Sequence, residues 1–230
     1  ATNTLADTST LVVSGGILDL GTNADTVAGV QQTGGTIQNG TLTSTTAYDM
    51  QAGAVSANLA GAVALNKTTA GTTTLSGTNT YTGTTTVSAG TLNLNSAGTA
   101  IAGDLTVAGG TATLQAANQI ADGKNVVVSS GTLDVAGFND TVNGVQITGG
   151  TITGTTGVLT STTAFDLQAG TVSAILGGAA GANKTTGGTV TLSKTNTYTG
   201  ATTVSAGQLT LGHATNTLAD TSTLVVSGGI

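Results

Sequence analysis

The sequence predicts an all-β fold, a parallel β-helix (β-solenoid) of about 19 residues per coil. Three observations predict it. A glycine preceded by Gly, Ala or Ser recurs every 18 to 22 residues, apolar residues alternate on both sides of that glycine, and the chain is rich in Thr and Val with no Pro. Alternation with a period of two is typical of a strand with one buried face. So short a coil can bury that face only by stacking on neighbouring coils.

A long internal repeat sets the length of the stack. The segment Ala1–Ile17 recurs letter for letter as Ala214–Ile230, an offset of 213 residues that contains eleven of the glycine intervals. We therefore expect one continuous β-solenoid over 1–230 with about 11 coils per repeat, cut from a longer tandem array. Half-repeats are expected at about 1–95 and 118–213, with an extra coil at about 96–117. Residues 214–230 are then the start of the next repeat.

Each coil is expected to begin with a strand that ends at a bend. Apolar residues three positions before the glycine, such as Val13, Val87 and Val204, predict the inward positions of this strand, and Tyr48 and Phe165 lie five before it. The small residue and the glycine suit a tight bend that can require positive φ. The predicted structural corners are Gly16, Gly35, Gly53, Gly71, Gly90, Gly110, Gly131, Gly150, Gly170, Gly188 and Gly207.

A second strand is expected after each bend, with its outer face rich in hydroxyl groups. Four coils carry an outward Thr-x-Thr, which predicts a possible surface-binding ladder of Thr72, Thr74, Thr111, Thr113, Thr151, Thr153, Thr189 and Thr191. Threonine also favours strands for its shape alone, which explains it without a ligand. The sequons at Asn66 and Asn183 fall where inward side chains are expected, so these two residues are predicted to form a buried amide ladder.

Composition excludes several classes of protein. Only 6% of residues are charged, the formal net charge is −6, and there is no Cys. Disulfide frameworks and cysteine metal sites are therefore impossible, and no basic patch is available for nucleic acid. No apolar run is long enough for a membrane span. His213 is the one His and has no Cys or second His near it in the sequence. The acidic pairs Asp19 with Asp25 and Asp134 with Asp140 recur in both half-repeats, which suits a structural role better than a single active site. No catalytic residue, metal or cofactor is therefore predicted.

One 20-residue segment occurs twice and resembles a known family. LSGTNTYTGTTTVSAGTLNL from Leu75 and LSKTNTYTGATTVSAGQLTL from Leu192 share the element N-x-Y-x-G-x-T-x-V-x-x-G-x-L. This element is similar to the strand repeat of bacterial autotransporter passenger domains. The resemblance implies a right-handed β-helix, type V secretion and an adhesin-like surface protein. Its residues are Asn79, Tyr81, Gly83, Thr85, Val87, Gly90 and Leu92, and again Asn196, Tyr198, Gly200, Thr202, Val204, Gly207 and Leu209.

The first functional hypothesis is therefore an extracellular structural and adhesive repeat, a rigid rod or fibre that acts in cell adhesion, aggregation or biofilm and is not an enzyme. It is expected at the bacterial cell surface, anchored in the outer membrane or released. Expected partners are further tandem copies, like rods side by side, surface glycans or abiotic surfaces. Two alternatives remain: a solenoid that binds ice or glycans through its Thr ladders, and a polysaccharide-cleaving β-helix enzyme that uses paired carboxylates.

Overall fold

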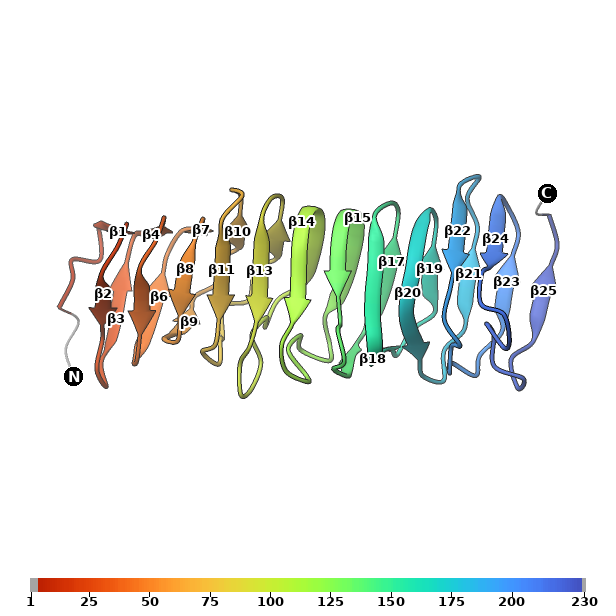
Figure 1. Cartoon of the computed structure of the whole chain (residues 1–230). Coiled ribbons are helices and arrows are strands. Elements are labelled where there is room, and N and C mark those ends of the chain that lie inside the picture. Colours follow the sequence, from red (N-terminus) through yellow and green to blue (C-terminus); the bar gives the residue numbers. More distant parts are fainter. Residues whose placement is uncertain (1–3, 229–230) are drawn as a thin grey trace.

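The computed structural model describes residues 4–228 and confirms the predicted β-solenoid of about eleven turns (Figure 1). In this range there are 25 strands and no helix, so no helix is available that could cross a membrane. All strand pairs are parallel, and paired residues of successive coils lie 17 to 22 positions apart. The strands stack into an elongated body with β1 and β25 toward opposite ends (Figure 1).

The strands stack into three columns, and the first two run along the whole stack. The first column holds β1 (Thr10–Val13), β4 (Gly29–Gln32), β7 (Tyr48–Met50), β10 (Leu65–Lys67), β12 (Thr85–Val87), the first parts of β14 (Leu105–Leu114) and β15 (Asn125–Asp134), β17 (Gly144–Ile147), β19 (Phe165–Leu167), β21 (Ala182–Lys184), β23 (Thr202–Val204) and β25 (Leu224–Val226). It precedes the corner in every coil.

The second column follows the corner. It holds β2 (Ile17–Asp19), β5 (Thr36–Gln38), β8 (Gly53–Val55), β11 (Thr72–Leu75), β13 (Thr91–Leu94), the second parts of β14 and β15, the first parts of β18 (Thr151–Ser161) and β20 (Gly170–Gly177), β22 (Thr189–Leu192) and β24 (Gln208–Leu211).

The third column is incomplete. It holds β3 (Ala24–Val27), β6 (Thr41–Ser44), β9 (Asn58–Ala60), β16 (Asp140–Val142) and the second parts of β18 and β20. Between β9 and β16 the only pairing on this side, within residues 4–228, is the isolated bridge Ile101–Ile120. Something other than a strand ladder must therefore satisfy the backbone there.

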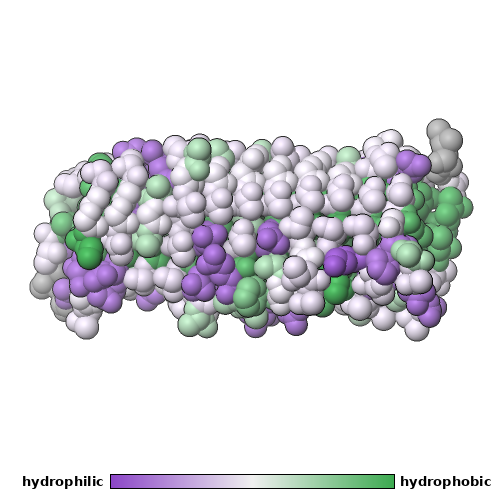
Figure 2. Space-filling model, in the orientation of Figure 1, coloured by the Kyte–Doolittle hydropathy of each residue, from purple (hydrophilic) through white to green (hydrophobic). Residues whose placement is uncertain are grey.

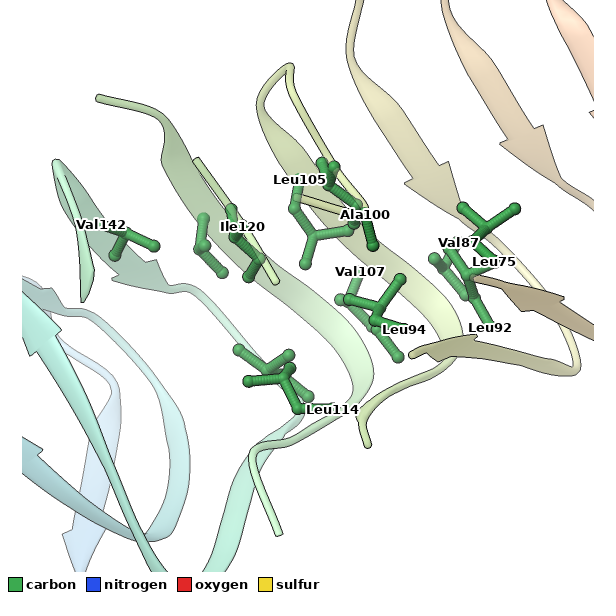
Figure 3. Close-up of a cluster of buried hydrophobic side chains, with 14 of the residues drawn as sticks. Leu75, Val87, Leu92, Leu94, Ala100, Leu105, Val107, Leu114, Ile120 and Val142 are labelled. Carbon is green, nitrogen blue, oxygen red and sulfur yellow. The ribbon is translucent and has the colours of Figure 1, made fainter. Parts of the chain in front are cut away.

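The core is a narrow stack of aliphatic side chains enclosed by the three columns. Figure 3 shows side chains from successive coils, among them Leu75, Leu94 and Leu114, lying over one another in the interior, and all three are fully buried. Two buried aromatic pairs interrupt the aliphatic stack. The ring centroids of Tyr48 and Tyr81 are 6.1 Å apart, and those of Phe165 and Tyr198 are 5.8 Å apart. Tyr48 and Phe165 thus occupy the interior, as their spacing before the glycine indicated.

Corner glycines serve both backbone shape and coil spacing. Eight of the eleven predicted corners have positive φ, for example Gly90 at 64° and Gly207 at 66°. Gly71, Gly110 and Gly188 do not, but a side chain at Gly110 would place Cβ 2.7 Å from the carbonyl oxygen of Gly90 in the preceding coil. Glycine is therefore required at these corners because the coils stack too closely to admit a side chain.

Candidate functional surfaces

Most of the passenger-like motif is an internal joint, because its asparagine, tyrosine, threonine and valine are buried in both copies. In its first copy, Asn79 is buried, with Oδ1 accepting from the Leu59 N–H at 2.9 Å and Nδ2 donating to the Ala100 carbonyl at 2.8 Å. In the second copy, Asn196 makes the equivalent bonds to Leu176 and Thr217 at 2.9 and 2.8 Å. Where the third column has no strand, these amides join the coils together with single backbone bonds, such as Thr80 N–H to the Leu59 carbonyl at 2.8 Å.

The tyrosine and threonine of the motif form a second buried joint. The Tyr81 hydroxyl lies 2.6 Å from Oγ1 of Thr85, and the Tyr198 hydroxyl lies 2.8 Å from Oγ1 of Thr202. Burial raises the pKa of both tyrosines, against the opposing effect of these bonds. At the glycine between them, a Cβ on Gly83 would lie 2.5 Å from the carbonyl carbon of Val63. The motif spacing is thus set by packing against the preceding coil.

Gln119 and Asp140 extend this internal polar system, and sequence reasoning missed their role. Gln119 is buried, and its side-chain Oε1 accepts from the backbone N–H of Ser96 at 2.7 Å. The backbone N–H of Gln119 donates to Oδ2 of Asp140 at 2.8 Å. Desolvation raises the pKa of Asp140 to about 6, although the Ile120 and Gln119 amides act against that shift. The equivalent Asp25 in the other half-repeat accepts from Thr4 and Leu5. Both carboxylates therefore cap backbone amides.

Two buried lysines correct the expected position of the amide ladder. Asn66 is half-buried and Asn183 is exposed, so the prediction that they point inward is wrong. The next residues, Lys67 and Lys184, take the inward positions and are fully buried. Lys67 Nζ donates to the carbonyls of Thr69 and Ala89, which lie at the corners of its own coil and the next. Desolvation lowers the pKa of both lysines.

These lysines sit where the second column changes register. Ala54 follows its corner glycine directly, yet it pairs with Thr74, which stands three residues after Gly71. The same slip by two residues pairs Thr171 with Thr191. The coils of Lys67 and Lys184 therefore have wider corners, and the long cationic side chain fills them and binds the corner carbonyls.

The register change aligns threonines that are out of step in the sequence. Of the predicted ladder, Thr72, Thr111, Thr151 and Thr191 fall in one row, whereas Thr74, Thr113 and Thr153 fall in a parallel row with Asn93, Asp134 and Ser173, and Thr189 pairs with Gln208. Intervening coils complete the first row without a gap. We call this row the threonine row: Thr72, Thr91, Thr111, Thr132, Thr151, Thr171, Thr191 and Thr210.

Apolar surface gathers at the C-terminal end of the stack. A hollow of about 260 Å³ opens there between β23, β24 and β25. Its lining includes Leu211 and Val226, whose side chains are 44% and 63% exposed. Figure 2 shows a large green area at this end, smaller green areas at the opposite end and along the lower part, and purple patches on an otherwise pale surface. The end of the core is therefore uncovered.

The other residues considered for catalysis or metal binding, His213 and Asp19, contact nearby backbone and amide groups. His213 is exposed, and its Nδ1 contacts the Thr215 carbonyl two residues away. Asp19 is exposed and accepts from Gln38 and Asn39, whereas its sequence neighbour Asp25 is buried. Hydrogen bonds from these amides lower the pKa of Asp19. Across residues 4–228, no three acidic or histidine side chains are grouped closely enough to hold a metal ion.

Comparison with known proteins gives one family and one relative. Residues 65–94 and 183–211 match the family described as Passenger-associated-transport-repeat. Over 208 residues the chain is 32% identical to the Adhesin BmaC autotransporter of Brucella suis biovar 1 (strain 1330), an alignment that covers 88% of this chain. The chain spans only 6% of the length of that relative. No solved structure matches the chain.

Proposed function

This chain carries the passenger repeat of autotransporters, and from that premise we propose that it forms a stiff adhesive rod at the bacterial cell surface. The rod is anchored in the outer membrane or released, and it acts by reach and by repeated weak contacts without catalysing a reaction. The adhesin relative supports the adhesive role. The caps formed by Asp25 and Asp140 speak against a carboxylate pair that cleaves polysaccharide, because these carboxylates are buried and bound to backbone amides.

The main support for a continuous rod is the position of the second copy of the opening segment. Leu224–Val226 is the second copy of Leu11–Val13, and it stacks on β23 in the column that β1 begins. Val13 is 6% exposed beneath β4, whereas its counterpart Val226 is 63% exposed at the open end. These two strands would form the two sides of a joint between tandem repeats. One 213-residue offset equals eleven turns, so a following repeat continues every column in phase.

Continuation of the stack also supplies the missing contacts at the open end. In the first copy, the strand after β1 is β2, which brings Leu18 against the core. The next copy of β2 would place the equivalent leucine over the hollow beside Leu209 and Leu211. Covering these side chains removes apolar surface from water, worth about 25 cal/mol per Å². Tandem repeats therefore stabilise one another at each joint.

Scattering from chains with one, two and three 213-residue repeats tests this proposal. With strands about 4.8 Å apart, each added repeat should lengthen the rod by about 53 Å and leave its cross-section unchanged. A maximum dimension that does not grow linearly, or a cross-section that widens, contradicts the continuous rod. Adhesion is tested separately by coating beads with each protein and counting attached beads on host cells, which should rise with repeat number through multivalency.

The threonine row favours a second candidate function, binding of ice or another crystalline surface. Eight threonines in consecutive coils present hydroxyl and methyl groups at one strand spacing on a rigid sheet. Thermal hysteresis and ice-shaping measurements test it, with Thr132→Lys and Thr151→Lys as variants in the middle of the row. Activity that both variants abolish supports this candidate, and no hysteresis in the wild-type protein removes its ice-binding form.

A further inference from the structure

A groove of about 330 Å³ lies on the outer face of the first column, across β15, β17 and β19. Its floor is Gly144, which pairs with Asn125 of the coil before and faces Thr163 of the coil after. A Cβ on Gly144 would lie 3.0 Å from Asn125 Oδ1 and 3.1 Å from Thr163 Oγ1. Since the backbone of Gly144 does not have positive φ, the glycine is needed here for space and not for a left-handed conformation.

A fixed carboxylate forms one side of this groove. Oδ2 of Asp166 accepts from Nε2 of Gln146 at 2.6 Å and from Nε2 of Gln168 at 2.8 Å. Within residues 4–228, the other oxygen, Oδ1, has no hydrogen-bond partner, so it is available to accept from a ligand. The two amides hold the carboxylate in one orientation before any ligand binds, which lowers the entropic cost of binding.

The other side of the groove is rigid and partly apolar. Asn125 Oδ1 accepts from Nδ2 of Asn143 at 2.9 Å, which leaves the Asn125 amide group as a donor. Oγ1 of Thr163 donates to the Asn143 carbonyl at 2.8 Å. Val127, which pairs with Gln146, and Ala164 add apolar surface to the lining. Acceptor, donor and apolar surface therefore meet within one shallow depression.

We propose that this groove binds neutral glycans, with Asp166 and Asn125 pairing with sugar hydroxyls while Val127 and Ala164 contact the C–H face of a pyranose ring. Each ligand group has a matching partner: an acceptor for hydroxyl hydrogens, an amide donor for hydroxyl oxygens, and an apolar wall. The only charge in the lining is that of Asp166, so uronic acids and other anionic sugars are repelled. The proposal rests on the adhesive function and gives it a ligand class.

The glutamine clamp on the carboxylate recurs in the other half-repeat, but the free carboxylate oxygen does not. Gln31 and Gln51 donate to Oδ2 of Asp49 at 2.9 and 2.8 Å, beside Gly29. A Cβ on Gly29 would lie 2.8 Å from Oγ1 of Thr46, so this position is equally restricted to glycine. Oδ1 of Asp49 accepts from Oγ1 of Thr68 at 3.2 Å, and Thr10 stands where Asn125 stands in the groove. A tandem array would then carry one groove with a free carboxylate oxygen in every repeat. Weak binding at each groove would add up along the rod.

Calorimetry with neutral hexose and N-acetylhexosamine tetrasaccharides, and with an oligouronate of equal length, tests the groove. We expect one of the neutral sugars to bind with a dissociation constant of about 1 mM or lower, in the weak range for a small ligand, and the oligouronate not to bind. Gly144→Val should fill the groove and Asp166→Asn should remove the anionic acceptor, each lowering affinity at least about tenfold. Gly187→Val is the matched control, because no atom lies within 4 Å of the position of its Cβ.

Any of three results would overturn the proposal that the groove binds neutral glycans. No neutral tetrasaccharide binds the wild-type protein, the Gly144→Val and Asp166→Asn variants bind the sugar as well as wild type, or the oligouronate binds best. Circular dichroism and thermal melting of every variant show whether the fold is retained. Bead adhesion reports on the proposed function independently. Beads that adhere although no tetrasaccharide binds would contradict glycan binding in the groove and leave the adhesive rod in place. Variants that lose sugar binding but still adhere would support glycan binding in the groove and show that adhesion does not depend on it.

Discussion

The side-chain amide of Asn79 donates from Nδ2 to the backbone carbonyl of Ala100, one coil further along the stack, at 2.8 Å. Its Oδ1 accepts from Leu59 in the coil before. One buried side chain therefore joins three coils on the side where the third column has no strand between β9 and β16. In water-free surroundings an unmade hydrogen bond costs more than a made one contributes, so this joint is a sensitive point of the rod.

Replacing Asn79 with leucine should lower the free energy of unfolding by about 2 to 4 kcal/mol, because two buried backbone groups lose their partners while the side-chain volume is kept. Urea denaturation followed by circular dichroism measures the loss. Asn183→Leu is the control at an exposed asparagine and should change stability by less than about 0.5 kcal/mol. Equal transition midpoints for the two variants would show that the amide joint does not stabilise the stack.

Tyr81→Phe and Thr85→Val should each destabilise by about 1 to 2 kcal/mol, because each leaves one buried hydroxyl without its partner. The double variant removes both hydroxyls together and should cost less than the sum of the single changes, with a coupling of about 1 kcal/mol. A thermodynamic cycle from four denaturation curves measures this coupling. Strict additivity would mean that the 2.6 Å contact contributes nothing to stability.

Gly90→Ala should cost at least about 2 kcal/mol, because alanine disfavours the positive φ of 64° and its Cβ would meet carbonyl oxygens at 2.3 Å. Gly187→Ala has open space around it and should change stability by no more than about 0.5 kcal/mol. Thermal unfolding of both variants gives the comparison. A Gly90→Ala protein that melts with the wild type would contradict the role of the corner glycines.

Asp140 should make the rod more stable at mildly acid pH than at neutral pH. Its pKa in the folded state is about 6, above the ordinary value of 3.8, so the folded state binds more protons between these values. The contribution is fully present below about pH 4 and is lost as pH rises through 6, a change of about 2 to 3 kcal/mol. Denaturation between about pH 4.5 and 8 should show this slope in wild type and in Asp134→Asn.

Asp140→Asn should flatten the profile, since the amide does not titrate. A wild-type profile that rises toward pH 8, or an Asp140→Asn profile with the wild-type slope, would show that this carboxylate is not the group responsible.

The local pattern predicted the inward residues well and the polar interior poorly. Val87, Leu92 and Tyr48 are buried because alternation fixes the side of the strand on which each lies. Lys67 and Asp140 are buried against their ordinary preference, and each is accepted only because backbone groups of a neighbouring coil meet it there. Those neighbours lie about twenty residues away, so a pattern read within one coil does not reveal them.

The sequence by itself determined the coil length, the bends and the in-phase repeat, because glycine spacing and alternation act within one coil. Only the tertiary structure decided which outward residues become neighbours. The wider corners at Lys67 and Lys184 shift the pairing by two residues, and this shift aligns Thr171 with Thr191 and completes the threonine row. The physical reason is that strand register depends on the path of the backbone around two successive bends, and that path is settled by packing between coils.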